Sequence, residues 1–302
     1  MAEMLGAAEY AQKQQWAQNN RQRAKELILD ATVLQNELFD LGDLSPFLRM
    51  LARMPYQNPR NLLLLSARNP EASALTGFRI WQRRIPDPMA PVLRSGQKGK
   101  GIELLVPFTD TAKNSITWYA ALHFDVSQVN VSYKPHVVYE PDSPSHISSL
   151  ISALITVLRE HHNLSIMPAT DSDDINTLKA ADIEGRLLNG MLLLRQDLSE
   201  EQKLNFLATT TCRLYLQYKK VPQNLENYAS LCAAYALSLL WNIPNLSDLP
   251  TNPTLLSSVP KEERYPVLDL LQRCVYTIDS QVSIPYRSTL DLDAEVSAEL
   301  GI

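Results

Sequence analysis

Residues 47–84 read FLRMLARMPYQNPRNLLLLSARNPEASALTGFRIWQRR, and this stretch decides the fold of the first half of the chain. Its first part places leucine and methionine at helical spacing after Ser45-Pro46, a pair typical of an N-cap followed by proline at the first helical position. Pro59 marks the start of another helix, which runs through the leucines at 62–65 and ends near Asn69-Pro70. The stretch therefore begins with two short predicted helices.

The end of the same stretch changes character at Gly77. Residues 78–83 alternate in polarity, which predicts an extended segment with Arg79, Trp81 and Arg83 on one face. Ahead of the stretch, residues 7–41 predict a long helix. Beyond it follow the Gly/Lys-rich turn 95–101 and two strands, 102–108 and 118–126. The first unit is thus predicted to be α+β, with helices first and a small antiparallel sheet after them.

The second half of the chain is predicted to be mostly helical, with one β-hairpin. Asn189-Gly190 is typical of a tight hairpin turn, and Ser199 is typical of a helix N-cap. The predicted helices are 146–162, 199–219, 224–241 and 261–280, and the hairpin strands are 183–188 and 191–194. We therefore predict two α+β domains, at 1–129 and 146–280, with a proline-containing linker at 130–145 and a tail at 281–302.

The composition is that of a folded protein. Of the 302 residues, 45% are hydrophobic and 20% are charged, which is enough to bury a core and unlike a disordered chain. The N-terminal segment lacks the pattern of a secretory signal, and no apolar run approaches the ~20 residues of a membrane span. Three irregularly spaced cysteines indicate neither a disulfide framework nor a zinc site. We expect a cytoplasmic protein with no cofactor and no membrane partner.

Charge is distributed unevenly along the chain. The net charge is −5, but residues 46–101 contain ten basic and two acidic side chains, a net charge of +8. The remaining residues then carry −13. A charge asymmetry of this size indicates a polyanionic partner such as nucleic acid. The alternative is an ordinary solvated surface whose partner charges come from other parts of the fold.

Several motifs occur together in the first half, in a fixed order. They are Tyr56 and Asn61, Asn69-Pro70-Glu71-Ala72, Gly77-Phe78, Trp81, the turn at 96–101, and Phe124-Asp125-Val126-Ser127-Gln128. Their joint order resembles the N-terminal single-stranded-DNA-binding domain of ArdC/LtrC-type antirestriction proteins, which occur on plasmids and integrative conjugative elements. The resemblance covers about residues 44–130. It departs from the family pattern by an extra residue in 56–61 and by a longer proline-rich segment at 85–91.

The second half resembles the zincin-like peptidase domain of the same family. The resemblance rests on the order of hairpin, Leu-Ser-Glu-Glu-Gln-Lys, helix, and a further helix with Ala-Tyr at 234–235. In catalytic zincins an HExxH helix supplies two zinc ligands and the general base. The matching positions here hold Thr209, Thr210 and Arg213, and the third ligand falls at Leu231. These side chains do not offer the donors zinc prefers, so we expect a pseudo-metallopeptidase that is not an enzyme.

The resemblance and the basic segment together predict a sequence-tolerant interface for single-stranded DNA. Basic side chains would neutralise phosphates, and bases would stack on Trp81 or Tyr56. The expected DNA-binding residues are Tyr56, Arg60, Asn61, Arg79, Trp81, Arg83, Arg84, Lys98 and Lys100. For Trp81 the alternative is a core tryptophan that Arg79 and Arg83 merely flank. The second domain would then serve as a scaffold or contact a protein partner.

Two other function classes remain open at this stage. One is a hydrolase with a non-standard active site, for which Cys212 beside Arg213 is a candidate nucleophile without a histidine nearby in sequence; a buried structural cysteine is the alternative. The other is an interaction scaffold that does not bind nucleic acid. The five histidines show no His-x3-His spacing, and the acidic run 171–174 lacks the glycine and terminal glutamate of a calcium loop.

Overall fold

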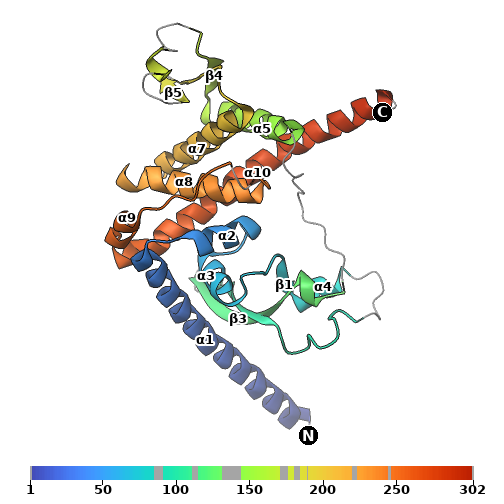
Figure 1. Cartoon of the computed structure of the whole chain (residues 1–302). Helices are drawn as coiled ribbons and strands as arrows, with labels where there is room; N and C mark the ends of the chain where they lie inside the picture. The colour runs from blue at the N-terminus through green and yellow to red at the C-terminus, as the bar shows by residue number, and fades with distance from the viewer. Residues whose placement is uncertain are drawn as a thin grey trace. The chain divides into compact units, whose positions relative to one another are not determined.

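The computed structural model describes residues 2–84, 91–110, 115–130, 144–170, 176–179, 184–188, 190–219, 223–243 and 246–300. The chain folds into two compact units (Figure 1). Unit 1 comprises Met1–Lys134 together with Val259–Tyr265, and unit 2 comprises Pro135–Ser258 together with Pro266–Ile302. Both units combine helices with a three-stranded sheet, so the fold class is α+β, as predicted.

Unit 1 packs helices against an antiparallel sheet. The helices are α1 (Ala2–Leu41), α2 (Ser45–Arg53), α3 (Pro59–Arg68) and the short α4 (Phe78–Gln82). The strands are β1 (Leu75–Gly77), β2 (Ile102–Asp110) and β3 (Ser115–Asp125), and a 3₁₀ turn, η1 (Val126–Gln128), follows β3. The strand order is β1-β3-β2; α1 packs on β2 and β3, and α3 packs on β2 and α1. Burial of the leucines of α3 against this layer supplies the core.

The start of α10 (Lys261–Leu300) belongs to unit 1 through Arg264. This side chain is buried, and its guanidinium donates to the Asn36 backbone oxygen, the Asn36 side chain and, at 2.7 Å, the Asp40 carboxylate. The same guanidinium lies over the Phe39 ring, 5.4 Å from its centroid. Arg264 thus fixes the start of α10 to the last two turns of α1 through hydrogen bonds to Asn36 and Asp40.

Unit 2 contains α5 (Pro144–His162), α7 (Glu200–Tyr218), α8 (Gln223–Leu240), α9 (Pro253–Ser258) and most of α10. Its sheet has the order β4-β6-β5, formed by β4 (Ser165–Pro168), β5 (Gly185–Leu188) and β6 (Met191–Leu194). β5 and β6 form the predicted antiparallel hairpin, while β4 pairs with β6 in parallel. α7 packs against both α5 and α8.

Three elements of unit 2 meet at His146. Its ring is buried, with Nδ1 2.8 Å from the Tyr286 hydroxyl and Nε2 2.7 Å from the Trp241 backbone oxygen. Because a carbonyl oxygen only accepts, Nε2 carries the proton and donates to Trp241. The histidine therefore links α5, the end of α8 and α10 through buried hydrogen bonds.

Local sequence signals predicted most helix boundaries. Ser199 caps α7, accepting from the backbone N–H of Gln202, whose side chain in turn accepts from the N–H of Ser199. Asn58 caps α3 through one bond, its side-chain oxygen accepting the backbone N–H of Asn61. Ser45 was predicted to be an N-cap but is the first residue of α2; Leu44 occupies the cap, and the carboxylate of Asp43 accepts the Ser45 N–H.

Two other predictions were wrong, and one strand was missed. Residues 78–83 were predicted to be extended, but Phe78–Gln82 form α4. The last helix was predicted to end at Ser280, yet α10 continues through the expected tail to Leu300. β4 was not predicted at all, because it is short, ends in a proline and pairs with a strand distant in sequence.

The predicted linker lies, for residues 131–143, outside the described part of the chain, as does the proline-rich segment 85–90. Asn130 is described, and its side-chain amide donates to the backbone oxygens of Pro91 and Leu93. In the part of the chain that the structure describes, no helix is long and apolar enough to cross a membrane.

Candidate functional site

The end of β3 organises the loops of unit 1 around Asp125. One carboxylate oxygen of this buried residue accepts the backbone N–H groups of Ser73 and Ala74, and the other accepts that of Ser127. Burial acts to raise the pKa of Asp125, but these backbone donors outweigh it and the pKa lies below its usual value. An ionised Asp125 thus fixes the loop after α3 to the sheet.

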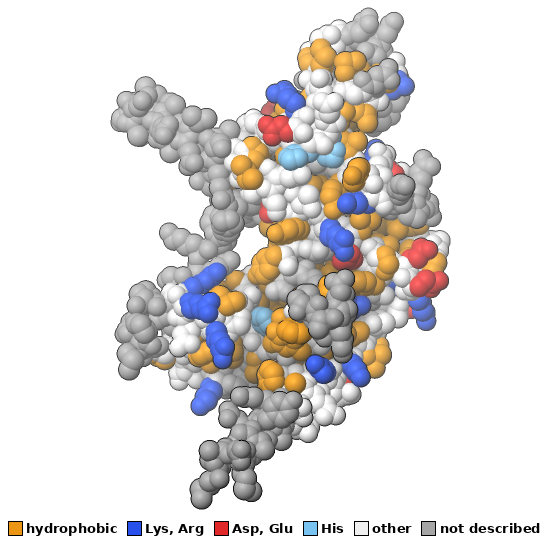
Figure 2. Space-filling view, turned by 180° about the vertical axis from the view of Figure 1, so that it is seen from behind, with side chains coloured by type: hydrophobic (Ala, Val, Ile, Leu, Met, Phe, Trp, Pro, Cys, Tyr) orange, Lys and Arg blue, Asp and Glu red, His pale blue; other side chains and the backbone are white. Residues whose placement is uncertain are grey.

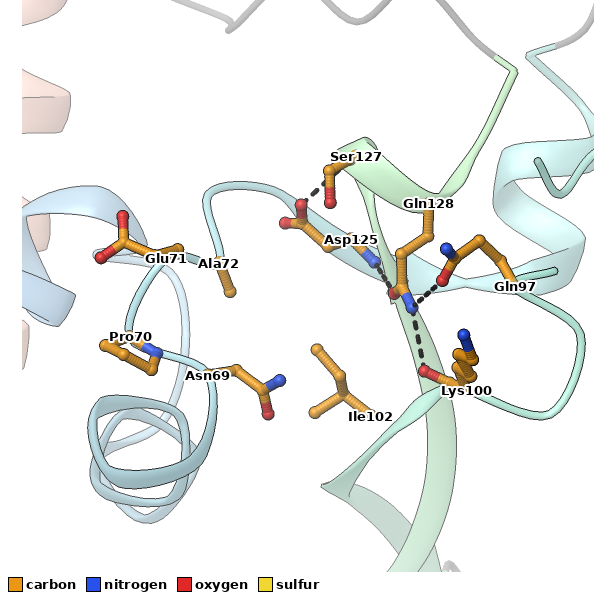
Figure 3. Close-up of a pocket in the computed structure, with 10 residues that line it drawn as sticks. All are labelled: Asn69, Pro70, Glu71, Ala72, Gln97, Lys100, Ile102, Asp125, Ser127 and Gln128. Carbon is orange, nitrogen blue, oxygen red and sulfur yellow. Dashed lines mark hydrogen bonds between the residues drawn. The ribbon is translucent and has the colours of Figure 1, made fainter. Parts of the chain in front are cut away.

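Gln128 fixes the Gly/Lys-rich turn to the same place. Its Oε1 accepts the Asp125 backbone N–H, which completes a capping box. Its Nε2 donates to the Lys100 backbone oxygen at 2.9 Å and to Oε1 of Gln97 at 3.2 Å (Figure 3). Gly96 and Gly99 adopt positive φ angles, 75° and 81°, which glycine tolerates without strain. The turn is therefore held by its backbone, and its lysine side chains are exposed.

A cavity of about 350 Å³ lies between these fixed loops (Figure 3). Its walls come from three segments far apart in the sequence: the loop after α3, the Gly/Lys turn with the start of β2, and the end of β3. The lining residues are Asn69, Pro70, Glu71, Ala72, Gln97, Lys100, Ile102, Asp125, Ser127 and Gln128. Three of the six motifs that carry the family resemblance, those at 69–72, 96–101 and 124–128, therefore converge on one cavity.

Two of the predicted DNA-binding residues are structural instead. Trp81 is 1% exposed, and its Nε1 donates to the Phe124 backbone oxygen at 2.7 Å. It packs in a small core with Phe124, Val92 and Val129. Asn61 is also buried. Its amide donates to the Leu105 oxygen and accepts the Leu105 N–H. Trp81 is therefore a core tryptophan, which was the alternative given for it. Neither side chain is exposed enough to contact a base.

The remaining predicted residues lie at the surface of unit 1. Arg79, Arg83, Lys98 and Lys100 are exposed, and none of them forms an ion pair with another described residue. Arg84 is also exposed, and its guanidinium lies 5.4 Å from the Trp81 ring centroid. Figure 2 shows Lys and Arg side chains gathered on the side of this unit on which α4 lies. We call Arg79, Arg83, Arg84, Lys98 and Lys100 the basic surface.

Not every basic residue of the +8 segment contributes to this surface. Arg53 lies 3.6 Å from the Glu71 carboxylate and Arg68 lies 2.5 Å from that of Asp30, so part of their charge is balanced locally. Arg60 is half-buried, and its guanidinium stacks on Tyr265 at 4.1 Å from the ring centroid. The prediction of an unbalanced basic segment therefore applies best to residues 79–100.

Tyr56 borders a second, smaller hollow of about 180 Å³. Ala74, Leu75, Thr76, Trp81 and Arg84 complete its lining. The Tyr56 side chain is 50% exposed, so its ring is accessible to a ligand. An aromatic ring next to a guanidinium group is a combination that stacks on flat, electron-rich groups.

The positions expected for zinc in unit 2 do not fit a metal ion. Thr209 and Thr210 on α7 are half-buried, Arg213 is exposed, and Leu231 on α8 is 46% exposed. Hydroxyls, a guanidinium and an alkyl chain lack the imidazole and carboxylate donors that zinc takes. Among the described residues, no group of three or more His, Cys, Asp and Glu side chains could hold a metal ion.

Cys212 is buried in the core of unit 2, together with Cys232 and Cys274. Burial raises the pKa of Cys232 to about 12. Burial, together with the neighbouring Cys212 thiol, also raises the pKa of Cys274. Low-pKa, accessible thiols are the reactive ones, so these cysteines have the character of core residues.

The residues that organise the cavity were not predicted as site residues. Asp125 and Gln128 entered the sequence argument only as part of the family motif. The spacing Asp-x-x-Gln is itself a signal, because a capping residue followed by Glu or Gln three positions later is typical of a capping box.

Comparisons with known proteins give a match to a solved structure and to nothing else. No protein-family model matches the chain, and no curated protein matches it. Among solved structures, the chain is similar to the metal-free crystal structure of the antirestriction protein ArdC from plasmid R388. The identity is 9%, the TM-score is 0.41, and the match covers 84% of this chain and 96% of that one. This match names the family that the sequence resembles, and at this level of similarity it carries no argument about activity.

Proposed function

We propose that unit 1 binds single-stranded DNA without strong sequence preference, through the basic surface and the exposed ring of Tyr56. The observation that carries the proposal is the set of exposed cations at 79–100 beside the Tyr56–Arg84 hollow. Arginine and lysine neutralise phosphates, and an accessible aromatic ring stacks on bases of any identity. The family resemblance supports the same partner.

The setting that we propose is antirestriction, that is, protection or handling of DNA that enters a cell on a mobile element. This part of the proposal rests on the resemblance to ArdC/LtrC-type proteins, and we place the protein in the reducing cytoplasm, where free thiols persist. Unit 2 would contribute a surface for a protein partner rather than zinc-dependent hydrolysis, because its ligand positions hold Thr209, Thr210, Arg213 and Leu231.

Fluorescence polarisation with a labelled oligo-dT strand tests DNA binding directly. We expect binding at about 50 mM NaCl and a steep loss of affinity at about 200 mM, because binding releases counterions from the strand. No binding at the lower salt concentration would overturn the proposal. Zinc content of the purified protein, measured by elemental analysis, tests the statement on unit 2; one tightly bound zinc ion per chain would contradict it.

A further inference from the structure

The cavity of Figure 3 has properties that the basic surface does not explain. Its volume of about 350 Å³ lies at the low end of the range for small-molecule sites, which is about 300–1,000 Å³. It therefore has room for one group of nucleoside size. Pro70, Ala72 and Ile102 give it apolar wall area, on which the face of a flat ring can pack.

Several polar groups in the cavity wall are available to a ligand. The carboxylate of Asp125 and the amide of Gln128 already bond to the surrounding loops. In contrast, the Asn69 side-chain amide, Nε2 of Gln97 and the Lys100 ammonium group have no hydrogen-bond partner within the described part of the chain. Figure 3 shows the Asn69 amide directed toward the space between the loops.

The charges of the wall disfavour a phosphate group inside the cavity. The Asp125 carboxylate and the Lys100 ammonium group carry opposite charges, and the Glu71 carboxylate, which Figure 3 shows directed away from Asn69, lies 3.6 Å from Arg53. The wall therefore has no excess of positive charge, and a phosphate group inside it would meet the negative charge of Asp125. Like charges close together cost free energy, and the cost grows away from bulk water. Amide groups, however, donate to and accept from the edges of neutral heterocycles, as Asn and Gln do when they recognise bases.

We propose that this cavity takes up one unpaired base of the bound strand, held at its edge by Asn69 and Gln97, while the phosphates stay on the basic surface. The Asn69 amide offers both a donor and an acceptor, and Nε2 of Gln97 and the Lys100 ammonium group add further donors. Every base edge carries carbonyl oxygens or ring nitrogens that accept from such donors, so we expect the cavity to take thymine and adenine alike. This inference rests on the proposed function, in which the strand is single-stranded DNA.

The test compares strands that differ in their bases but not in their phosphates. Oligo-dT, oligo-dA and an abasic strand of the same length are titrated against the wild-type protein, Asn69→Ala and the cavity-filling variant Ala72→Leu. Asn19→Ala, an exposed asparagine on α1, is the matched control. Circular dichroism and a thermal melt confirm that each variant is folded.

We expect both cavity variants to weaken oligo-dT binding about fivefold to tenfold, the value of about one hydrogen bond. Binding of oligo-dA weakens as well, binding of the abasic strand stays unchanged, and Asn19→Ala behaves as the wild type. Equal weakening of all three strands, or no weakening of any, would overturn the inference. If Asn69→Ala does not fold, Asn69→Ser takes its place. Equal weakening of all three strands, or no weakening, in Asn69→Ser would likewise overturn the inference.

Failure of the proposed function gives a different result. If the wild-type protein binds no strand at low salt, the probe becomes free thymidine, observed by saturation-transfer NMR. A thymidine signal that is present with the wild type and lost with Ala72→Leu supports the cavity even though strand binding has failed. No signal, or equal signals from both proteins, overturns the cavity as a base site.

Discussion

The side-chain amide of Asn61 hydrogen-bonds both backbone groups of Leu105. Nδ2 donates to the Leu105 oxygen at 3.0 Å, and Oδ1 accepts the Leu105 N–H at 2.9 Å. One buried side chain thereby fixes α3 to β2, with the geometry of a neighbouring strand. The residue that the sequence placed at the DNA surface instead holds the sheet against its helix.

Replacement of Asn61 by alanine should lower the free energy of unfolding by about 2–4 kcal/mol, because it leaves two buried backbone groups unpaired. Urea denaturation of the full chain, followed by circular dichroism, measures the change. Asn69→Ala, at the C-cap of the same helix, removes an amide that bonds to no other described residue and should cost much less. Equal losses in both variants would contradict this role for Asn61.

Substitution of Trp81 should lower stability, whereas substitution of Tyr56 should lower the affinity for DNA. Trp81→Phe removes the hydrogen bond to Phe124 and should cost about 1–3 kcal/mol of stability, with little effect on oligo-dT affinity. Tyr56→Ala should weaken oligo-dT binding by about 1–3 kcal/mol, the value of one stacked base. Binding titrations and denaturation curves on both variants check the pair. A Trp81→Phe protein that folds well and loses DNA would show that the tryptophan contacts bases.

Charge reversal on the basic surface should change the salt dependence of binding. For Arg83→Glu with Lys98→Glu, we expect the slope of log K against log salt to fall by about 1.4, since each lost phosphate contact removes about 0.7 for single strands. The control, Arg186→Glu with Arg213→Glu, changes the net charge equally on exposed residues of unit 2. Identical slopes for the two double variants would place the interface elsewhere.

Asp125 should contribute to stability in a manner that depends on pH. Its pKa is lower in the folded chain than in the unfolded chain, so ionisation of Asp125 stabilises the folded chain. The contribution is complete above the ordinary pKa of aspartate, about 3.9, and is lost as pH falls through the lower, folded value. The stability difference between the wild type and Asp125→Asn should therefore be largest near neutral pH and shrink below about pH 4. A difference that stays constant down to about pH 2 would contradict it.

The three cysteines should resist thiol reagents in the native protein. With a pKa of about 12, Cys232 has a thiolate fraction on the order of one in ten thousand at about pH 8, and burial also denies access. A coloured disulfide reagent should titrate almost no thiol in the native state and three in guanidinium chloride. Rapid reaction of one native thiol would instead favour the nucleophile that the sequence left open for Cys212.

The parts of the fold that the sequence predicted well depend on local chemistry. Gly190, with its positive φ, lies in the turn between β5 and β6, and Ser199 with Gln202 forms the start of α7, because turn and cap preferences act over a few residues. The prediction for the α4 segment was wrong because five or six residues are too few to distinguish the two-residue period of a strand from the 3.6-residue period of a helix. Trp81 resolves the ambiguity through its bond to Phe124, a contact across 43 residues of chain.

The candidate site was predictable in its charge but not in its shape. Exposed cations at 79–100 follow from composition, since lysine and arginine are rarely buried without a partner. The cavity depends on Asp125 and Gln128, which hydrogen-bond to loops 28 to 52 residues away in the sequence. No periodicity in a single sequence reveals such contacts. The family motif marked these residues, and the structure supplies the physical reason for their joint occurrence.

Arg264 has a consequence for how the protein can be divided. Because this residue comes from Val259–Tyr265 and completes the end of α1, unit 1 is encoded by two separated stretches of the gene. The residues between them, which belong to unit 2, are in effect an insertion. A clone that stops at Lys134 would therefore omit a piece of the very module it is meant to express, and would leave Asn36 and Asp40 without their buried guanidinium. An autonomous version of unit 1 would need residues 259–265 restored, for instance through a designed connection that replaces the inserted stretch.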